Sequence, residues 1–222
     1  MTKKNETDPL LNPEEPKKKT RITLKNEEKI LNAAEIIIAE YGFHGTTIDL
    51  IAEQAQISKP NLLYYFRTKQ DLYIAVLKRT IDVWVSALTQ LDPDGDPRIE
   101  LGKYIADKID MSRDRPLESR IFANEILRGA QLLKHYLSTE LKNIVDEKAK
   151  TIKHWIELGK IAPVEPIHLL FLIWAATQHY ADFSVQVSAL TGKNEGPDHN
   201  DFETIKASLN HIILSGILTR KD

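Results

Sequence analysis

The chain has 222 residues, 42% of them hydrophobic, which is enough to bury a core in one large domain or two small ones, so disorder of the whole chain is excluded. Because 30 Lys and Arg residues stand against 32 Asp and Glu residues, the net charge is only −2, and any surface that attracts a polyanion has to be local. The absence of cysteine excludes disulfide scaffolds, Cys-ligated zinc, iron–sulfur clusters and thiol nucleophiles, and it favours a cytoplasmic location.

Residues 1–20 are predicted to be a flexible tail, because this charged stretch with three prolines cannot bury enough apolar surface to order itself. The tail ends in a basic run that contains no acid and continues into the first predicted helix: Lys17, Lys18, Lys19, Arg21 and Lys25. This run is either a solvated tail that aids solubility or an arm that contacts a polyanion. Its place directly before the first helix favours the arm.

Three short helices are predicted after the tail. The first ends at Gly42, which stands where a residue with positive φ stops a helix. Its apolar residues follow helical spacing: Ile30, Ala34, Ile37, Ile38 and Tyr41. Thr46 and Thr47 precede the second helix and Ser58 precedes the third, so hydroxyl groups cap both. The second and third helices are predicted over residues 48–55 and 59–65.

A long fourth helix is predicted to begin at a capping box formed by Thr68 and Asp71. Turn-forming residues at 92–97 mark the loop that follows it. Further helices are predicted over about residues 98–113, 117–128, 131–159, 165–190 and 200–219. No segment alternates with period two, so we predict an all-α protein of about nine helices, with a small amino-terminal bundle and a larger helical domain.

Several other classes of protein are not indicated. The longest apolar run, Leu169–Ala176, is far shorter than the roughly 20 residues that a membrane-spanning helix needs. No apolar stretch of signal-peptide length follows the amino terminus, so secretion is not expected. No glycine pattern predicts a phosphate-binding loop.

The second and third helices, separated by only Gln56 and Ile57 before the Ser58 cap, have the dimensions of a helix-turn-helix. On the third helix, Lys59, Asn61 and Tyr64 can donate to phosphates or pair with base edges, and this helix carries no acid. Tyr64 and Tyr65 point about 100° apart, so one should face outward while the other leans against the bundle. This face therefore suits a polyanion such as DNA.

Short motifs occur in a fixed order over about residues 25–72. They are Gly42-Phe43-His44-Gly45-Thr46-Thr47, Ile51-Ala52, Ser58-Lys59 and Leu63-Tyr64-Tyr65-Phe66, followed by Lys69 and Leu72. This order resembles the DNA-binding domain of the TetR family of bacterial repressors. The resemblance implies that three helices form a DNA-binding domain whose third helix enters the major groove, while six more bind an effector and dimerise. We therefore predict a helix-turn-helix DNA-binding domain over residues 21–67 and an effector-binding and dimerisation domain over residues 68–222.

The candidate DNA contacts come from the arm, the helix caps, the third helix and the start of the fourth. They are Lys19, Arg21, Thr46, Thr47, Lys59, Asn61, Tyr64, Tyr65 and Lys69. Lys69 lies in a first turn, where its ammonium and the helix amino terminus would both attract a phosphate, although a plain surface lysine is the alternative. Gln56 departs from the family, which usually has glycine there; a left-handed backbone at Gln56 would cost about 1 kcal/mol.

The resemblance continues over roughly residues 42–192 to a uracil-responsive member of the family that controls pyrimidine use. The further motifs are Leu72–Leu77, Asp146-Glu147-Lys148, Gly159-Lys160, Ala162-Pro163, Ile173-Trp174-Ala175 and Thr177–Phe183. They imply a ligand-responsive repressor that uracil or a similar pyrimidine releases from a palindromic operator. A TetR-like regulator with an unrelated effector remains the alternative.

Trp174 and Gln178 lie four residues apart on one helix face and are the candidate effector contacts. A buried tryptophan alone is more often part of a core, but a buried amide needs hydrogen-bond partners, and a planar pyrimidine would supply them. Trp84 and Trp155 are weaker candidates for the same site.

Three other interpretations find less support. Glu165 and His168 match one half of the di-metal pattern of four-helix bundles, but a second such pair is missing, so we expect no metal site. A helical enzyme would need a convergent catalytic set, which the spacing does not provide, so we expect no catalytic residues and no cofactor. A pure protein-interaction module would not need the basic arm and the third-helix donors together.

The helices at 165–190 and 200–219 carry more apolar residues than one face can bury, so we expect a homodimer built on them.

Overall fold

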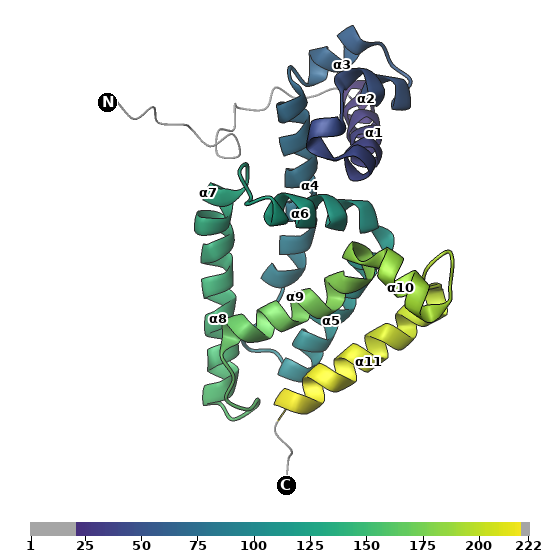
Figure 1. Ribbon diagram of the computed structural model, residues 1–222. Coiled ribbons are helices and arrows are strands. Elements are labelled where there is room, and N and C mark those ends of the chain that lie inside the picture. Colours follow the sequence, from purple (N-terminus) through teal and green to yellow (C-terminus); the bar gives the residue numbers. More distant parts are fainter. Residues whose placement is uncertain (1–20, 219–222) are drawn as a thin grey trace. The chain divides into compact units, whose positions relative to one another are not determined.

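The structure, a computed structural model, describes residues 21–218, so the part of the predicted arm that contains Lys19 lies outside the described residues. Within this range the regular structure is helical, and the only β interaction is an isolated antiparallel bridge between Ile161 and Leu218. The all-α prediction is confirmed (Figure 1). None of the helices in residues 21–218 is long and apolar enough to cross a membrane.

Two compact units divide the chain. The first unit comprises the described residues up to Ile81 together with the separate segment Arg120–Ser138. The second unit comprises Asp82–Ser119 together with the described residues from Thr139 onward. Each unit is therefore built from two stretches of chain.

The first unit contains the predicted three-helix bundle. Its elements are α1 (Arg21–Gly45), α2 (Ile48–Gln54), α3 (Lys59–Tyr65), the first part of α4 (Lys69–Thr89), most of α6 (Pro116–Leu127) and α7 (Lys134–Tyr136). Tyr73 on α4 donates a hydrogen bond of 3.0 Å from its hydroxyl to the buried carboxylate of Glu125 on α6. The same carboxylate accepts a bond of 3.0 Å from the backbone N–H of Leu132. The segment from α6 onward is thus fixed to α4 inside this unit.

The predicted helix caps of the first unit are present. Gly42 has φ 67° and interrupts α1. The side chain of Thr47 accepts a hydrogen bond from the N–H of Leu50, and that of Ser58 accepts one from the N–H of Asn61. Thr68 and Asp71 bond to each other's backbone N–H groups at 3.0 Å, which is the predicted capping box.

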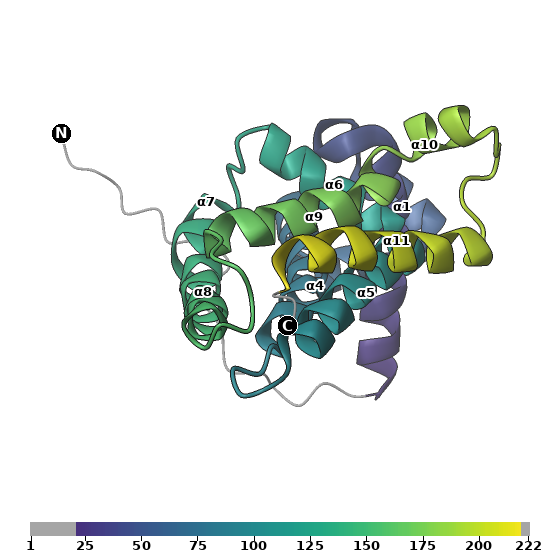
Figure 2. The same cartoon turned by 90° about the horizontal axis from the view of Figure 1, so that it is seen from below.

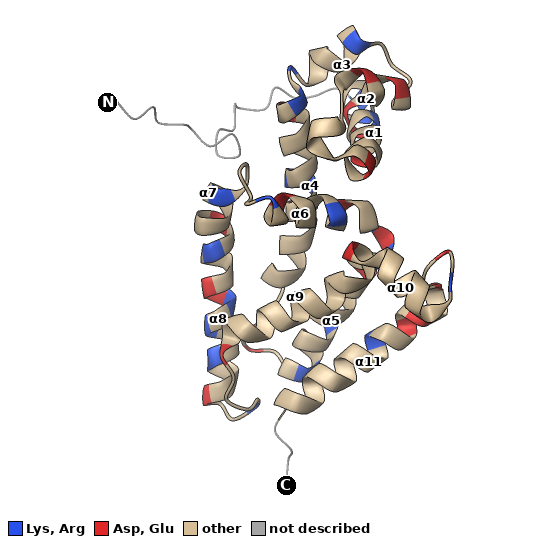
Figure 3. Cartoon of the chain, viewed as in Figure 1, with Lys and Arg blue, Asp and Glu red and all other residues tan. Residues whose placement is uncertain are grey.

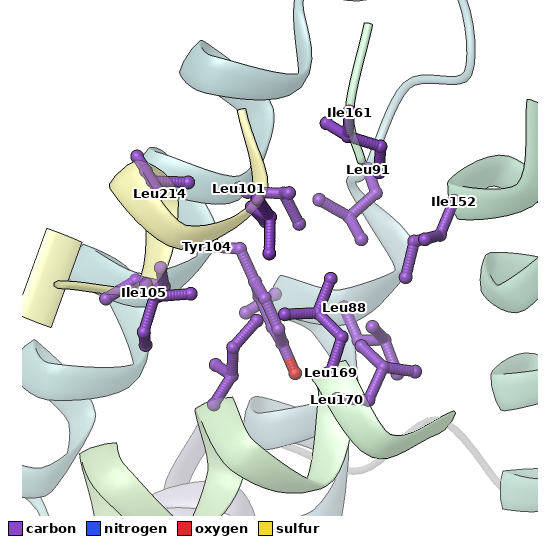
Figure 4. Packing of buried hydrophobic residues seen from close by; sticks show 14 of the residues in the cluster. Leu88, Leu91, Leu101, Tyr104, Ile105, Ile152, Ile161, Leu169, Leu170 and Leu214 are labelled. Carbon is purple, nitrogen blue, oxygen red and sulfur yellow. The ribbon is translucent and has the colours of Figure 1, made fainter. Parts of the chain in front are cut away.

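The second unit has α5 at its centre. Its elements are the rest of α4, α5 (Pro97–Asp114), α8 (Lys142–Glu157), α9 (Pro166–Asp182), α10 (Ser184–Thr191) and α11 (His199–Ile217). α5 packs against both α9 and α11, and Figure 2 shows α9 and α11 side by side. The core of this unit is mainly aliphatic and includes Tyr104, whose hydroxyl oxygen points toward the α9 leucines Leu169 and Leu170 in Figure 4.

Two predicted long helices are each divided in the structure. The helix expected over 131–159 consists of α7, a π-helical segment η1 (Leu137–Leu141) and α8. The helix expected over 165–190 is broken at Phe183, between α9 and α10. Neither break coincides with glycine or proline, and the apolar pattern continues across both, so periodicity alone could not locate them.

Candidate functional site

α3 presents most of its polar residues to solvent. Leu62 is fully buried and anchors the helix to the bundle. Lys59 and Asn61 are exposed, and Tyr64 has 80% of its surface exposed. The face predicted to read DNA is therefore open.

Tyr64 and Tyr65 point in different directions, as expected. Tyr64 faces outward, whereas Tyr65 is half-buried and its hydroxyl accepts a hydrogen bond of 3.0 Å from Asn26 on α1. The two rings meet edge to face with centroids 5.3 Å apart. Tyr65 thus holds Tyr64 in place while leaning on the first helix.

The charge on this face is modest. Lys59 is the only charged residue of α3, and its ammonium forms an exposed ion pair of 2.8 Å with Asp49 on α2. Figure 3 shows the acidic residues of α2 in red beside this helix. Because an exposed ion pair is worth little in water, a phosphate can compete for the lysine.

The side chains of two predicted DNA contacts form hydrogen bonds within the protein. Thr46 is 1% exposed and its hydroxyl donates to the carbonyl of Gly42 at 2.7 Å, so the structure corrects the prediction: Thr46 stabilises the end of α1. Lys69 donates to the carbonyls of Phe43 and Thr46 at 2.8 and 2.9 Å, and its ammonium lies 4.5 Å from the centroid of the Phe43 ring. Lys69 therefore joins α4 to the α1–α2 connection and keeps one N–H for a phosphate.

Other predicted contacts stay exposed. Arg21 is the exposed first residue of α1, and Thr47 is exposed at the amino end of α2. Gln56, in the turn between α2 and α3, has φ 50°. The expected left-handed backbone at a residue other than glycine is confirmed.

In the second unit, Trp174 and Gln178 lie one turn apart on α9, and both are partly buried. The indole N–H of Trp174 donates to the hydroxyl of Tyr104 on α5 at 2.6 Å, which leaves its ring face as the surface it can offer. No described residue forms a hydrogen bond with the Gln178 amide in residues 21–218. Gln178 is therefore available to a ligand.

The structure corrects the prediction for Trp155. Its side chain is fully buried, and its indole N–H donates to the carbonyl of Pro93 at 2.9 Å. Trp155 belongs to the hydrophobic core of the second unit. It is a packing residue.

Sequence reasoning missed Lys108, on α5. Only 3% of its surface is exposed, and its ammonium lies 3.6 Å from the centroid of the Trp84 ring. Burial lowers the pKa of Lys108 to about 7, against a smaller opposing effect of the Asp182 charge. The signal was present: Leu101, Tyr104, Ile105, Lys108 and Ile109 share one helix stripe, in which lysine is the single charged member.

Two family models match the chain. The model described as bacterial regulatory proteins, tetR family, matches residues 30–76, and the model described as YcdC-like protein, C-terminal region, matches residues 77–220. Together they take in both the helix-turn-helix and the larger helical part.

Curated proteins and solved structures agree with these matches. The regulator RutR of Escherichia coli K12, an HTH-type transcriptional regulator, is 44% identical over 203 residues, which are 91% of this chain and 95% of that protein. RutR of Shigella flexneri matches to the same extent. A transcriptional regulator from Streptomyces coelicolor has a similar structure, with 26% identity, a TM-score of 0.64 and coverage of 86% of this chain and 98% of that one. A tetR-family protein from Rhodococcus RHA1 shares the fold, with 18% identity, a TM-score of 0.70 and coverage of 89% and 99%.

Proposed function

Because the chain belongs to the TetR family of bacterial regulatory proteins and is a DNA-binding transcriptional regulator, not an enzyme, we propose that it is a repressor which uracil or a similar pyrimidine releases from DNA. Its targets are then genes of pyrimidine-related metabolism. The likeness to RutR extends over 91% of the chain, including the effector part, and this supports a shared class of effector.

One observation carries the effector proposal. The Gln178 amide has no hydrogen-bond partner among the described residues, and it lies one turn from Trp174 on α9. Uracil presents two N–H donors and two carbonyl acceptors in one plane. A glutamine amide can accept from one N–H and donate to the adjacent carbonyl. The Trp174 ring would cover a face of the pyrimidine.

The DNA-binding side of the proposal rests on α3. Two copies of α3 in a two-fold dimer would enter successive major grooves about 34 to 36 Å apart, so the operator is expected to be nearly palindromic. Lys59, Asn61 and Tyr64 are the proposed contacts, with Arg21 and Thr47 beside them.

We assign the dimer interface to α9 and α11. Both helices expose large apolar side chains, including Leu172 and Ile212. α11 also contributes Phe202, Leu214 and Ile217 to the core, so deleting this helix would unfold the second unit. Leu172→Glu and Ile212→Glu are therefore better tests than truncation.

The effector is tested by calorimetric titration of uracil into the parent, Gln178→Leu and the control Gln131→Leu, an exposed glutamine of the first unit. Uracil should bind the parent and the control equally and bind Gln178→Leu about 10- to 100-fold more weakly, because the ligand loses paired donors and acceptors. No heat with the parent would reject the pyrimidine. Equal affinity for all three would reject the role of Gln178.

DNA binding is tested with Tyr64→Ala against the control Tyr41→Ala, an exposed tyrosine of α1 outside the reading face. Tyr64→Ala should weaken operator binding while the control leaves it unchanged. Lys59→Ala should also lower the dependence of log affinity on log salt by about one unit. Unchanged binding by both α3 variants would mean that another helix reads the DNA.

The interface is tested by sedimentation. Leu172→Glu and Ile212→Glu should shift the protein toward monomers, whereas Leu127→Glu, at a still more exposed leucine of α6, should not. Dimers of unchanged strength in both variants would place the interface elsewhere.

A further inference from the structure

Lys108 lies between two hydrogen bonds that join α5 to α9. One turn before it, the Tyr104 hydroxyl accepts from Trp174 at 2.6 Å. One turn after it, the Ser112 hydroxyl donates to the carbonyl of Thr177 at 2.7 Å. Lys108 thus sits on the face of α5 that meets α9. The part of α9 opposite it contains Trp174 and is followed directly by Gln178.

The Lys108 ammonium lacks the partners that burial normally requires. It forms no hydrogen bond or ion pair with any residue in the described range 21–218. Its close neighbour is the face of the Trp84 ring, with the centroid at 3.6 Å. A ring face attracts a cation, but it does not satisfy three N–H donors. The Lys108 side chain is almost wholly enclosed, and its N–H donors are available for a ligand to satisfy.

One anion, Asp182, acts on Lys108 through its charge. The charge of Asp182, the carboxyl-terminal residue of α9, favours protonated Lys108. The Asp182 carboxylate also accepts a hydrogen bond from the Ser119 hydroxyl at the first turn of α6. Asp182 therefore offsets part of the Lys108 charge and is itself bound by Ser119.

Three α9 residues near this site share one side of that helix. Trp174, Gln178 and Asp182 follow each other at intervals of four residues, and such residues lie above one another on a helix. The α9 side thus presents a ring, an amide and a carboxylate in succession, and the α5 side presents an ammonium.

We propose that the Lys108 ammonium binds a carbonyl oxygen of the effector directly, on the side of the ligand that Gln178 does not reach. This inference rests on the proposed pyrimidine effector. One glutamine amide can satisfy one N–H and one carbonyl of uracil, which leaves the second carbonyl without a donor. A lysine supplies the missing donor, and its charge makes the hydrogen bond stronger than a neutral one.

The assignment also accounts for selectivity. A pyrimidine that carries an amino group in place of that carbonyl would turn N–H donors toward an ammonium, which is a repulsive arrangement. The site is therefore expected to prefer pyrimidines with two carbonyl groups over aminopyrimidines.

The test combines ligand and protein changes. Uracil, 2-thiouracil and 4-thiouracil are titrated by calorimetry into the parent, Lys108→Met and the control Lys103→Met, an exposed lysine on the same helix. Replacing one carbonyl oxygen by sulfur weakens the acceptor at that position alone. The loss that sulfur causes in the parent should vanish in Lys108→Met for whichever of the two positions Lys108 contacts.

The expected results are specific. Lys108→Met should bind uracil about 10- to 100-fold more weakly than the parent, and Lys103→Met should bind as the parent does. If the parent binds no uracil, the proposed function fails. If the parent binds uracil but Lys108→Met binds it equally well, or if both sulfur penalties are the same in parent and variant, the function stands and the role of Lys108 is refuted.

A second variant guards against misfolding. Lys108→Gln keeps an N–H donor on a side chain one atom shorter and should retain part of the affinity for uracil. If its affinity is no better than that of Lys108→Met while neither variant melts below the parent, a hydrogen bond from this position to the ligand is refuted.

Discussion

Replacing Lys108 by methionine should stabilise the protein at neutral pH in the absence of effector. Methionine has a similar length and fills the same buried space without a charge. Burial lowers the pKa of Lys108 from 10.5 to about 7, and a shift of this size corresponds to roughly 5 kcal/mol against the charged form. The cation–π contact with the Trp84 ring stabilises the charged form by on the order of 1 to 2 kcal/mol. We therefore expect the variant to gain about 3 kcal/mol in free energy of unfolding at pH 7.

The gain should depend on pH with a definite sign. Between about pH 7 and the ordinary lysine pKa of 10.5, the unfolded chain binds a proton at Lys108 that the folded chain does not. The stability of the parent should therefore rise with pH across this window, relative to the variant. The advantage of Lys108→Met is largest at and below pH 7 and shrinks toward pH 10.

Denaturation by urea measures this difference. Parent and variant are unfolded at pH 7, 8.5 and 10 at one protein concentration, because dimerisation also contributes to stability. The difference between the two proteins cancels the titration of every other group. A difference that stays constant over this range, or a variant less stable than the parent at pH 7, would show that Lys108 is not held as a buried, destabilised cation.

Three further substitutions test the local structure by thermal melting. Gln56→Gly should raise stability slightly, by up to about 1 kcal/mol, because glycine adopts φ 50° without strain; a loss would mean that the turn is not strained. Asp198→Ala should cost about 1 kcal/mol because it removes the capping box at the start of α11, and an unchanged melting temperature would argue that the cap contributes nothing. Tyr73→Phe should cost about 1 to 3 kcal/mol because it removes a donor from the buried Glu125 carboxylate, whereas the exposed Tyr64→Phe should be neutral; equal melting of the two would contradict the bond.

Much of the architecture could be predicted from local chemistry. The ends of the first helices follow from Gly42, Thr47, Ser58 and the Thr68 capping box, which all act within four residues of themselves. The break at Phe183 could not be predicted, since no helix-breaking residue marks it and only packing decides it.

The sites were predictable to a different extent. The outward turn of Tyr64 follows from helix geometry and from the apolar face that buries Leu62. The internal bonds of Lys69 join residues more than 20 positions apart in sequence, so no local pattern could reveal them. Lys108 could have been noticed as a charge within an apolar stripe, but its partner Trp84 lies on another helix, and only the fold brings the two together.

The discontinuity of the first unit bears on how such regulators can be inherited and recombined. The unit that carries α3 also needs Arg120–Ser138, because Glu125 holds Tyr73 and the Arg128 guanidinium packs beside Gly42. A single recombination crossover near residue 76, where the two family models meet, would combine α1–α3 of one regulator with the α6 segment of another. Exchange of DNA specificity between relatives should therefore proceed by point changes on α3, or by paired crossovers that carry both stretches together, and chimaeras made with one junction should lose the contacts of Tyr73 and Gly42.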